Sequence, residues 1–306
     1  MSFAGIQPRF AAGTECSGAE RVGLMAGWGR FPIVVAETLR AAGREVYCLG
    51  VKDHADPALQ KICTHFQWIG LARLGGAIRY YRRHDVVNAT MAGKIHKVNL
   101  YQPWSWLKHL PDWTCLKTFY PHFISTKRDR KDDTLLGAIV DTFARAGITF
   151  GPATHYAPEL LVKFGCLTRR RPTTAQQADI SFGFQLAKEM GRLDVGQSVA
   201  VKGRAALAIE AIEGTDQCIR RAGTLCRSGE FTVVKVAKPQ QDMRFDVPTI
   251  GVGTLESMVA SGGRVLAIEA DRTIIIDQPD VIEFANRHGL TIVAFDAQGQ
   301  MPAEAA

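Results

Sequence analysis

The sequence predicts an α/β fold, with a Rossmann-like N-terminal domain built on a parallel sheet and an α+β C-terminal domain. The chain has 306 residues, which suggests two domains. Short apolar runs alternate with helical patterns in the first half, whereas hairpin-like strand pairs occur in the second. We expect a flexible extension at 1–19, the first domain at 20–152 and a catalytic second domain at 153–306.

The first half begins with a compact apolar strand at Arg21–Ala26. Pro32 then opens a helix, because its fixed φ suits the first helical turn, and Gly43 ends that helix. The later elements are strands at Glu45–Val51, Val86–Met91 and Gly147–Pro152 and helices at Leu74–Arg83 and Thr134–Ala146. This alternation predicts βαβ units and parallel strand pairing.

The second half is less regular and contains two expected hairpins. One joins Gln197–Val201 to Ala205–Ile209, and the other joins Arg264–Glu269 to Thr273–Ile276. The remaining elements are helices at Ala175–Gly191, Thr215–Arg221, Thr254–Ser261 and Pro279–Gly289 and strands at Phe231–Val236 and Leu290–Ala294.

Composition excludes several classes of protein. Hydrophobic residues make up 46% and charged residues 22%, which excludes a disordered or collagen-like chain. No run reaches the roughly 18 apolar residues that span a bilayer. The seven cysteines are scattered without a CxxC pair, so neither a disulfide framework nor a zinc site is expected. With no secretory signal at the start, we expect a cytoplasmic protein.

The net charge of +7 is concentrated between Arg79 and Asp132, where eleven Lys and Arg residues face four Asp residues. Three of the five tryptophans also lie in this stretch. Aromatic and basic residues together suit a membrane surface or single-stranded nucleic acid, and a loop with core aromatics is the third interpretation. We favour peripheral contact with an anionic membrane surface or with the lipid-bearing end of a substrate, without nucleic acid, through a basic run at Lys127, Arg128, Arg130 and Lys131.

Three segments carry candidate chemistry. Gly27 and Gly29 lie between a strand and a helix, where a phosphate contact and a simple tight turn are equally plausible. Glu210, Glu213 and Asp216 offer hard oxygen ligands for Mg²⁺, while Thr215 fits a helix cap better. The third and densest segment carries Lys235, Lys238, Asp242, Arg244 and Asp246; it suits a metal and a phosphate together better than a surface salt-bridge loop.

These motifs, in order, resemble the LpxI-type UDP-2,3-diacylglucosamine pyrophosphatases. The resemblance runs from Arg21 to Phe295, is most specific in the second half and is weak across Asn99–Lys131. It implies two α/β-type domains with the substrate between them, a divalent cation such as Mg²⁺, and hydrolysis to UMP and 2,3-diacylglucosamine 1-phosphate in lipid A biosynthesis. The motifs that carry it are Gly27-Trp-Gly-Arg-Phe-Pro32, Met91-Ala-Gly-Lys94, Asp133-Thr-Leu-Leu136, Leu193-Asp-Val-Gly-Gln197, Glu210-Ala-Ile-Glu-Gly-Thr-Asp216 and Lys238-Pro-Gln-Gln-Asp-Met-Arg-Phe-Asp-Val-Pro248.

The resemblance places the essential aspartate at Asp242, which would ligate the metal or orient and deprotonate the attacking water. Asp246, Glu210 and Glu213 are the further metal candidates. The expected substrate or phosphate contacts are Gly27, Gly29, Lys94, Gln197, Thr215, Lys235, Lys238, Gln241 and Arg244. The alternative function is a nucleotide-sugar or anionic-lipid binding protein without turnover. A homodimer is the expected assembly.

Overall fold

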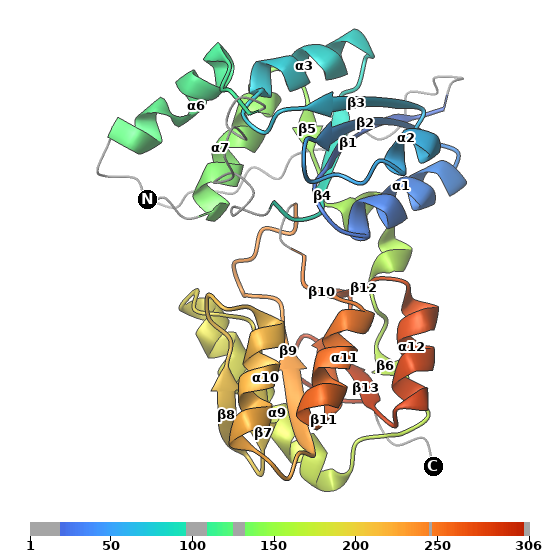
Figure 1. The fold of residues 1–306 in the computed structure, drawn as a ribbon, viewed down its shortest axis with the longest axis vertical. Coiled ribbons are helices and arrows are strands. Elements are labelled where there is room, and N and C mark those ends of the chain that lie inside the picture. The colour runs from blue at the N-terminus through green and yellow to red at the C-terminus, as the bar shows by residue number, and fades with distance from the viewer. Residues whose placement is uncertain (1–18, 96–108, 125–131, 245–246, 303–306) are drawn as a thin grey trace.

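The computed structural model describes residues 19–95, 109–124, 132–244 and 247–302, without the side chains of 121–124 and 132–134. These residues form two large β-sheets with helices on their faces and a small two-stranded sheet, which confirms the predicted α/β class (Figure 1). None of the helices in the described ranges is long and apolar enough to cross a membrane. The predicted extension and the basic run at 127–131 lie outside the described residues, apart from residue 19.

The N-terminal sheet has five parallel strands in the order β3-β2-β1-β4-β5, a Rossmann-like arrangement. Its strands are β1 (Arg21–Ala26), β2 (Glu45–Val51), β3 (His65–Ile69), β4 (Asn88–Ala92) and β5 (Thr149–Phe150). The strand order reverses between β1 and β4, and ligands of such sheets bind beyond the carboxyl ends of the strands at this point. The glycine turn after β1 therefore lies where a ligand is expected.

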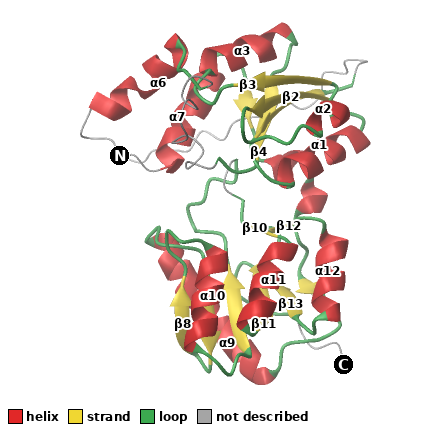
Figure 2. Ribbon diagram, viewed as in Figure 1, coloured by secondary structure: helices red, strands yellow, loops and turns green. Residues whose placement is uncertain are grey.

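Helices cover both faces of the N-terminal sheet (Figure 2). On one face pack α1 (Phe31–Ala41), α2 (Leu59–Ile62) and α8 (Ala153–Tyr156). On the other pack α3 (Leu74–Arg83), α6 (Trp113–Ile124) and α7 (Asp132–Arg145). A 3-10 turn at Pro158–Leu160 then leads toward the second sheet.

The C-terminal sheet has six strands in the order β6-β13-β11-β9-β7-β8, of which the central β13, β11 and β9 are parallel. Its strands are β6 (Gly165–Cys166), β7 (Ser198–Lys202), β8 (Ala205–Ile209), β9 (Phe231–Lys235), β11 (Gly263–Glu269) and β13 (Thr291–Phe295). One face carries α10 (Thr215–Leu225), α11 (Val252–Ser261) and α12 (Gln278–Arg287), and the other carries α9 (Thr174–Arg192).

The second predicted hairpin is wrong. β12 (Ile274–Ile275) does not return along β11 but pairs in parallel with β10 (Thr249–Ile250) in a separate two-stranded sheet. The residues after β11 turn away from it, because the amide of Ala270 donates to Phe295 O at 2.8 Å and that of Asp271 donates to Val162 O at 2.8 Å. This pairing brings Thr249 and the start of α11 to the edge of the site described below.

Asp179, a buried carboxylate of α9, holds the turn of the hairpin that was predicted correctly. It accepts from the amides of Gly203 at 3.1 Å and Arg204 at 2.6 Å, both of which have φ of 59°. We expect Asp179→Ala to lower the free energy of unfolding by about 2 kcal/mol, because two amides lose a charged acceptor. Urea unfolding followed by circular dichroism measures the loss, and an unchanged midpoint would contradict this role.

Candidate active site

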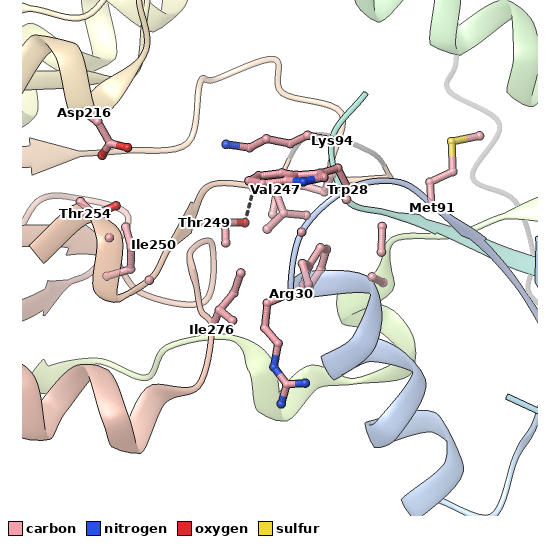
Figure 3. A pocket seen from close by; sticks show the side chains of 18 of the residues that line it. Trp28, Arg30, Met91, Lys94, Asp216, Val247, Thr249, Ile250, Thr254 and Ile276 are labelled. Atoms are coloured by element: carbon pink, nitrogen blue, oxygen red, sulfur yellow. Dashed lines mark hydrogen bonds between the residues drawn. The ribbon is translucent and has the colours of Figure 1, made fainter. Parts of the chain in front are cut away.

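The carboxyl ends of strands from both sheets enclose a cavity of about 380 Å³. The N-terminal half contributes the turns after β1 and β4, and the C-terminal half contributes the loop after β9 and the start of α11. Figure 3 shows Trp28, Arg30 and Lys94 around this cavity together with Thr249 and Thr254 from the other half. The site is therefore shared by two segments more than 100 residues apart in the sequence.

The two turns of the N-terminal half pack backbone against backbone. Trp28 N donates to Lys94 O at 2.8 Å, and Lys94 N donates to Trp28 O at 2.9 Å. A Cβ on Gly27 would lie 2.7 Å from Lys94 O, so Gly27 is needed for this close approach, in agreement with the tight-turn interpretation. Gly29 differs, since it has φ of 106°, has open space around it and lines the cavity with Lys94.

An ion pair joins the two halves at one side of the cavity. Arg30 Nε lies 3.2 Å from Asp277 Oδ2, and the hydrogen bond to Asp277 raises the pKa of Arg30. Both side chains are partly exposed, at 46% and 36%, so the pair contributes little to stability. The ion pair fixes the position of the Arg30 side chain beside the cavity.

The predicted Lys238–Arg244 segment forms a loop that its own side chains support. Lys238 N donates to Gln241 Oε1 at 2.8 Å, and Gln241 N donates back to Lys238 O at 3.0 Å. Gln241 Nε2 donates to Gln197 Oε1 at 3.4 Å, and Lys238 Nζ lies 2.7 Å from Asp194 Oδ1. Lys238, Gln241 and Gln197, which were predicted as substrate or phosphate contacts, thus lie together, but none of them lines the cavity.

Asp242 and Arg244 form the charged end of this loop. Arg244 Nε donates to Asp242 Oδ1 at 2.9 Å and to Oδ2 at 3.0 Å, and Arg244 N donates to Oδ1 at 3.0 Å. Burial raises the pKa of Asp242, but the hydrogen bonds and charge of Arg244 more than offset this and hold it below its ordinary value. Asp242 is therefore a carboxylate at neutral pH, and its partner Arg244 lines the cavity.

A buried ion pair anchors the base of the loop. Glu269, at the end of β11, is 1% exposed and accepts from Lys188 Nζ of α9 at 2.7 and 3.0 Å. The same pair holds both backbone groups of Ala237, since Ala237 N donates to Glu269 Oε2 at 2.9 Å and Lys188 Nζ donates to Ala237 O at 3.0 Å. The loop therefore leaves the sheet from a fixed point.

Lys235 lies in a buried polar network beneath the cavity. Its ammonium donates to Thr215 Oγ1 at 3.2 Å and to Thr249 O at 3.1 Å. Thr215 Oγ1 in turn donates to Glu210 Oε1 at 3.0 Å, while the buried Glu210 Oε2 has no hydrogen-bond partner among the described residues. The cap prediction for Thr215 is wrong, because Gly214 occupies the N-cap position and Thr215 uses its hydroxyl in this network.

Comparison with known proteins identifies the family of this chain. Family models described as the LpxI N-terminal and C-terminal domains match residues 21–160 and 163–293. The chain belongs to the LpxI family. Within it, a relative from Caulobacter vibrioides named UDP-2,3-diacylglucosamine pyrophosphatase LpxI is 31% identical over 285 residues, which cover 91% of this chain and 98% of the relative. The resemblance found in the sequence is confirmed.

The metal predicted from the LpxI resemblance has no assembled site among the described residues. No three His, Cys, Asp or Glu side chains there are placed to hold an ion. Glu213 pairs with Arg221, Asp242 with Arg244, and Glu210 with Thr215. Asp246 lies outside the described residues. In these positions the carboxylates cannot bind one cation together. Mg²⁺ therefore stays a prediction, and no step of the reaction proposed below depends on it.

Sequence reasoning missed two parts of the LpxI site. Trp28, which is 51% exposed, lines the cavity although it was considered only as part of the glycine turn. The start of α11 lines it through Gly251, Gly253 and Thr254. A glycine pair between a short strand and a helix was a signal for this second part, because helix N-termini bind anions through their free amides.

Proposed function

We propose that this chain hydrolyses the pyrophosphate bond of UDP-2,3-diacylglucosamine to UMP and 2,3-diacylglucosamine 1-phosphate in lipid A biosynthesis. The observation that carries the proposal is the Asp242–Arg244 pair beside a cavity that both family domains line. A carboxylate next to a cation suits water attack on an anionic phosphorus, and the named relative supplies the substrate class. We include a cytoplasmic location and contact with the inner membrane in this proposal.

Positive groups line the path of a bound diphosphate. Lys94 and Arg244 reach the cavity from opposite halves, and the first turn of α11, whose helix dipole favours anions, also lines it. Phosphoanhydride hydrolysis places growing negative charge on the leaving phosphate, and fixed cations and amides stabilise that charge. Arg244 is suited to this because its planar guanidinium can contact two phosphate oxygens at once.

In the proposed reaction a water oxygen bonds to one phosphorus, and the bond from that phosphorus to the bridging oxygen breaks. Asp242 orients the water and accepts its proton, while the bridging oxygen leaves as a phosphate oxygen held by the cations. Lys235 acts indirectly, since its buried ammonium holds the hydroxyl of Thr215 and the backbone carbonyl of Thr249, a residue of the cavity wall. Lys235 is a positioning residue in this account, rather than the direct phosphate contact expected from the sequence.

Release of UMP from UDP-2,3-diacylglucosamine, followed by chromatography, tests the proposed function. We expect UMP and 2,3-diacylglucosamine 1-phosphate in equal amounts, and a parallel sample with EDTA tests the predicted Mg²⁺ requirement. UDP-N-acetylglucosamine, which lacks the two long acyl chains, serves as the comparison substrate and is expected to be hydrolysed more slowly. Substrate that binds without any UMP release would contradict hydrolysis and favour the alternative, a binding protein without turnover.

A further inference from the structure

Helix α6 has an exposed apolar surface in addition to the surface that packs against the rest of the domain. Trp113, Leu116 and Tyr120 are 80%, 50% and 64% exposed and are spaced three and four residues apart. Residues at this spacing share one face of a helix. The opposite face is covered, because Cys115 is buried and Thr118 Oγ1 lies 3.0 Å from Thr142 Oγ1 of α7. The helix therefore has a second, exposed apolar face, here called the α6 face.

The charged side chains within α6 and its neighbour α3 have one sign. Lys117 is exposed and lies on the same side of the helix as Trp113 and Tyr120. Helix α3, which packs against α6, has exposed Arg79 and Arg83, and neither helix contains an Asp or Glu residue. Tryptophan and tyrosine next to basic residues are typical of a surface that enters the headgroup region of an anionic bilayer.

The α6 face is also linked to the proposed active site. Helix α6 packs on α7, and the carboxylate of Asp141 in α7 helps to raise the pKa of Arg244 in the catalytic loop. The cavity of about 380 Å³ lies at the lower end of the range that encloses a drug-sized ligand. It can enclose a diphosphate and neighbouring rings, but the two acyl chains of the substrate must extend beyond it.

We propose that Trp113, Leu116, Lys117 and Tyr120 form a docking surface for an anionic phospholipid bilayer, which holds the enzyme where its substrate resides. This inference rests on the proposed function for the identity of the substrate, and on the exposed α6 face for the surface itself. It adds a defined helix face to the membrane contact predicted from the basic run at 127–131, which lies outside the described residues.

Co-sedimentation with vesicles of phosphatidylglycerol and of phosphatidylcholine tests the surface. The test variant is Trp113→Ser/Leu116→Ser/Tyr120→Ser, and the matched control is Val87→Ser/Leu225→Ser, which removes apolar side chains that are 58% and 65% exposed elsewhere. We expect the wild type and the control to bind phosphatidylglycerol vesicles. The test variant should bind them at least about tenfold more weakly, because three interfacial side chains are lost. Lys117→Glu should weaken binding to anionic vesicles only.

Turnover of detergent-dispersed substrate distinguishes a bilayer from the other partners that this surface could bind. We expect all variants to match the wild type there. Unchanged vesicle binding by the triple variant would overturn the proposal. A raised KM in detergent would also overturn it, because the face would then bind the acyl chains of the substrate. Loss of a dimer in sedimentation velocity would overturn it too, because the face would then bind a second copy of the chain. A wild type that binds vesicles through α6 but releases no UMP would support the surface and contradict the proposed function.

Discussion

Asp242→Asn is expected to lower kcat for UDP-2,3-diacylglucosamine by about a hundredfold to ten-thousandfold, the range for loss of a general base. Asparagine has nearly the same shape but cannot accept the proton of the attacking water. The fold should persist, because the hydrogen bonds of Asp242 are to Arg244, two residues away in the same loop. Steady-state UMP release measures kcat, and circular dichroism checks that the variant is folded.

Asp271→Asn is the matched control for this substitution. Asp271 also pairs with a basic side chain, Lys163 at 2.7 Å, but it lies beside a different cavity. We expect near-normal turnover from this variant. A comparable kcat in Asp242→Asn and the wild type would remove Asp242 from the mechanism.

The pH dependence of the same reaction reports on Arg244. Because Arg244 holds the pKa of Asp242 below its ordinary value, Asp242 stays ionised as the pH falls. In Arg244→Gln burial remains while the opposing charge is lost, so the pKa of Asp242 should rise. The acid limb of the kcat/KM profile should therefore move to higher pH, in addition to a lower maximum. An acid limb that stays in place would show that another group controls it.

Lys188→Met is expected to lower the free energy of unfolding by about 3–5 kcal/mol, because it leaves the buried Glu269 carboxylate without its partner. It should also reduce kcat by about tenfold to a hundredfold at temperatures where the variant is folded, since small displacements of a catalytic group are costly. The reason is that Lys188 and Glu269 hold Ala237, from which the loop to Asp242 begins. Urea unfolding and a separate determination of kcat and KM measure the two effects.

Asp179→Ala is the control that distinguishes a positioning role of Lys188 from a general effect on stability. Asp179 lies on the same helix as Lys188, but it holds the hairpin turn at the opposite end of the strands from the catalytic loop. It should therefore lower stability while leaving kcat unchanged in the folded protein. An equal loss of kcat in Asp179→Ala and Lys188→Met would show that Lys188 acts only through the stability of the fold. Recovery of kcat in Lys188→Arg would support a positioning role.

Much of the fold could be predicted because local patterns and tertiary structure agree. The strand at Arg21–Ala26 and the helix at Leu74–Arg83 match their predicted bounds, since each has a clear apolar pattern and defined ends. Strand β3 was missed, because at the sheet edge its burial alternates and polar His65 and Gln67 interrupt the apolar pattern. The β10–β12 pairing could not be predicted, because it joins segments whose register depends on the distant Phe295 and Val162 backbones.

The motifs named candidate residues for the site but could not give their arrangement. Gly29, Lys94 and Arg244 line one cavity, and Asp242 is hydrogen-bonded to Arg244. The sequence could not show that Lys238 is bound to Asp194 or that Glu213 is bound to Arg221, because both pairings depend on tertiary contacts. Glu269 and Lys188 were missed for the same reason, since each stands alone within an otherwise ordinary strand or helix.

A crystal structure of the Asp242→Asn variant with intact UDP-2,3-diacylglucosamine tests the central claim most directly. The account predicts that the diphosphate lies between the turn of Gly29 and Lys94 and the loop of Arg244, with residue 242 facing one phosphorus. Substrate bound instead at the second cavity, of about 360 Å³ and lined by Phe164 and Asp271, would contradict the account. So would a diphosphate that contacts only one of the two halves.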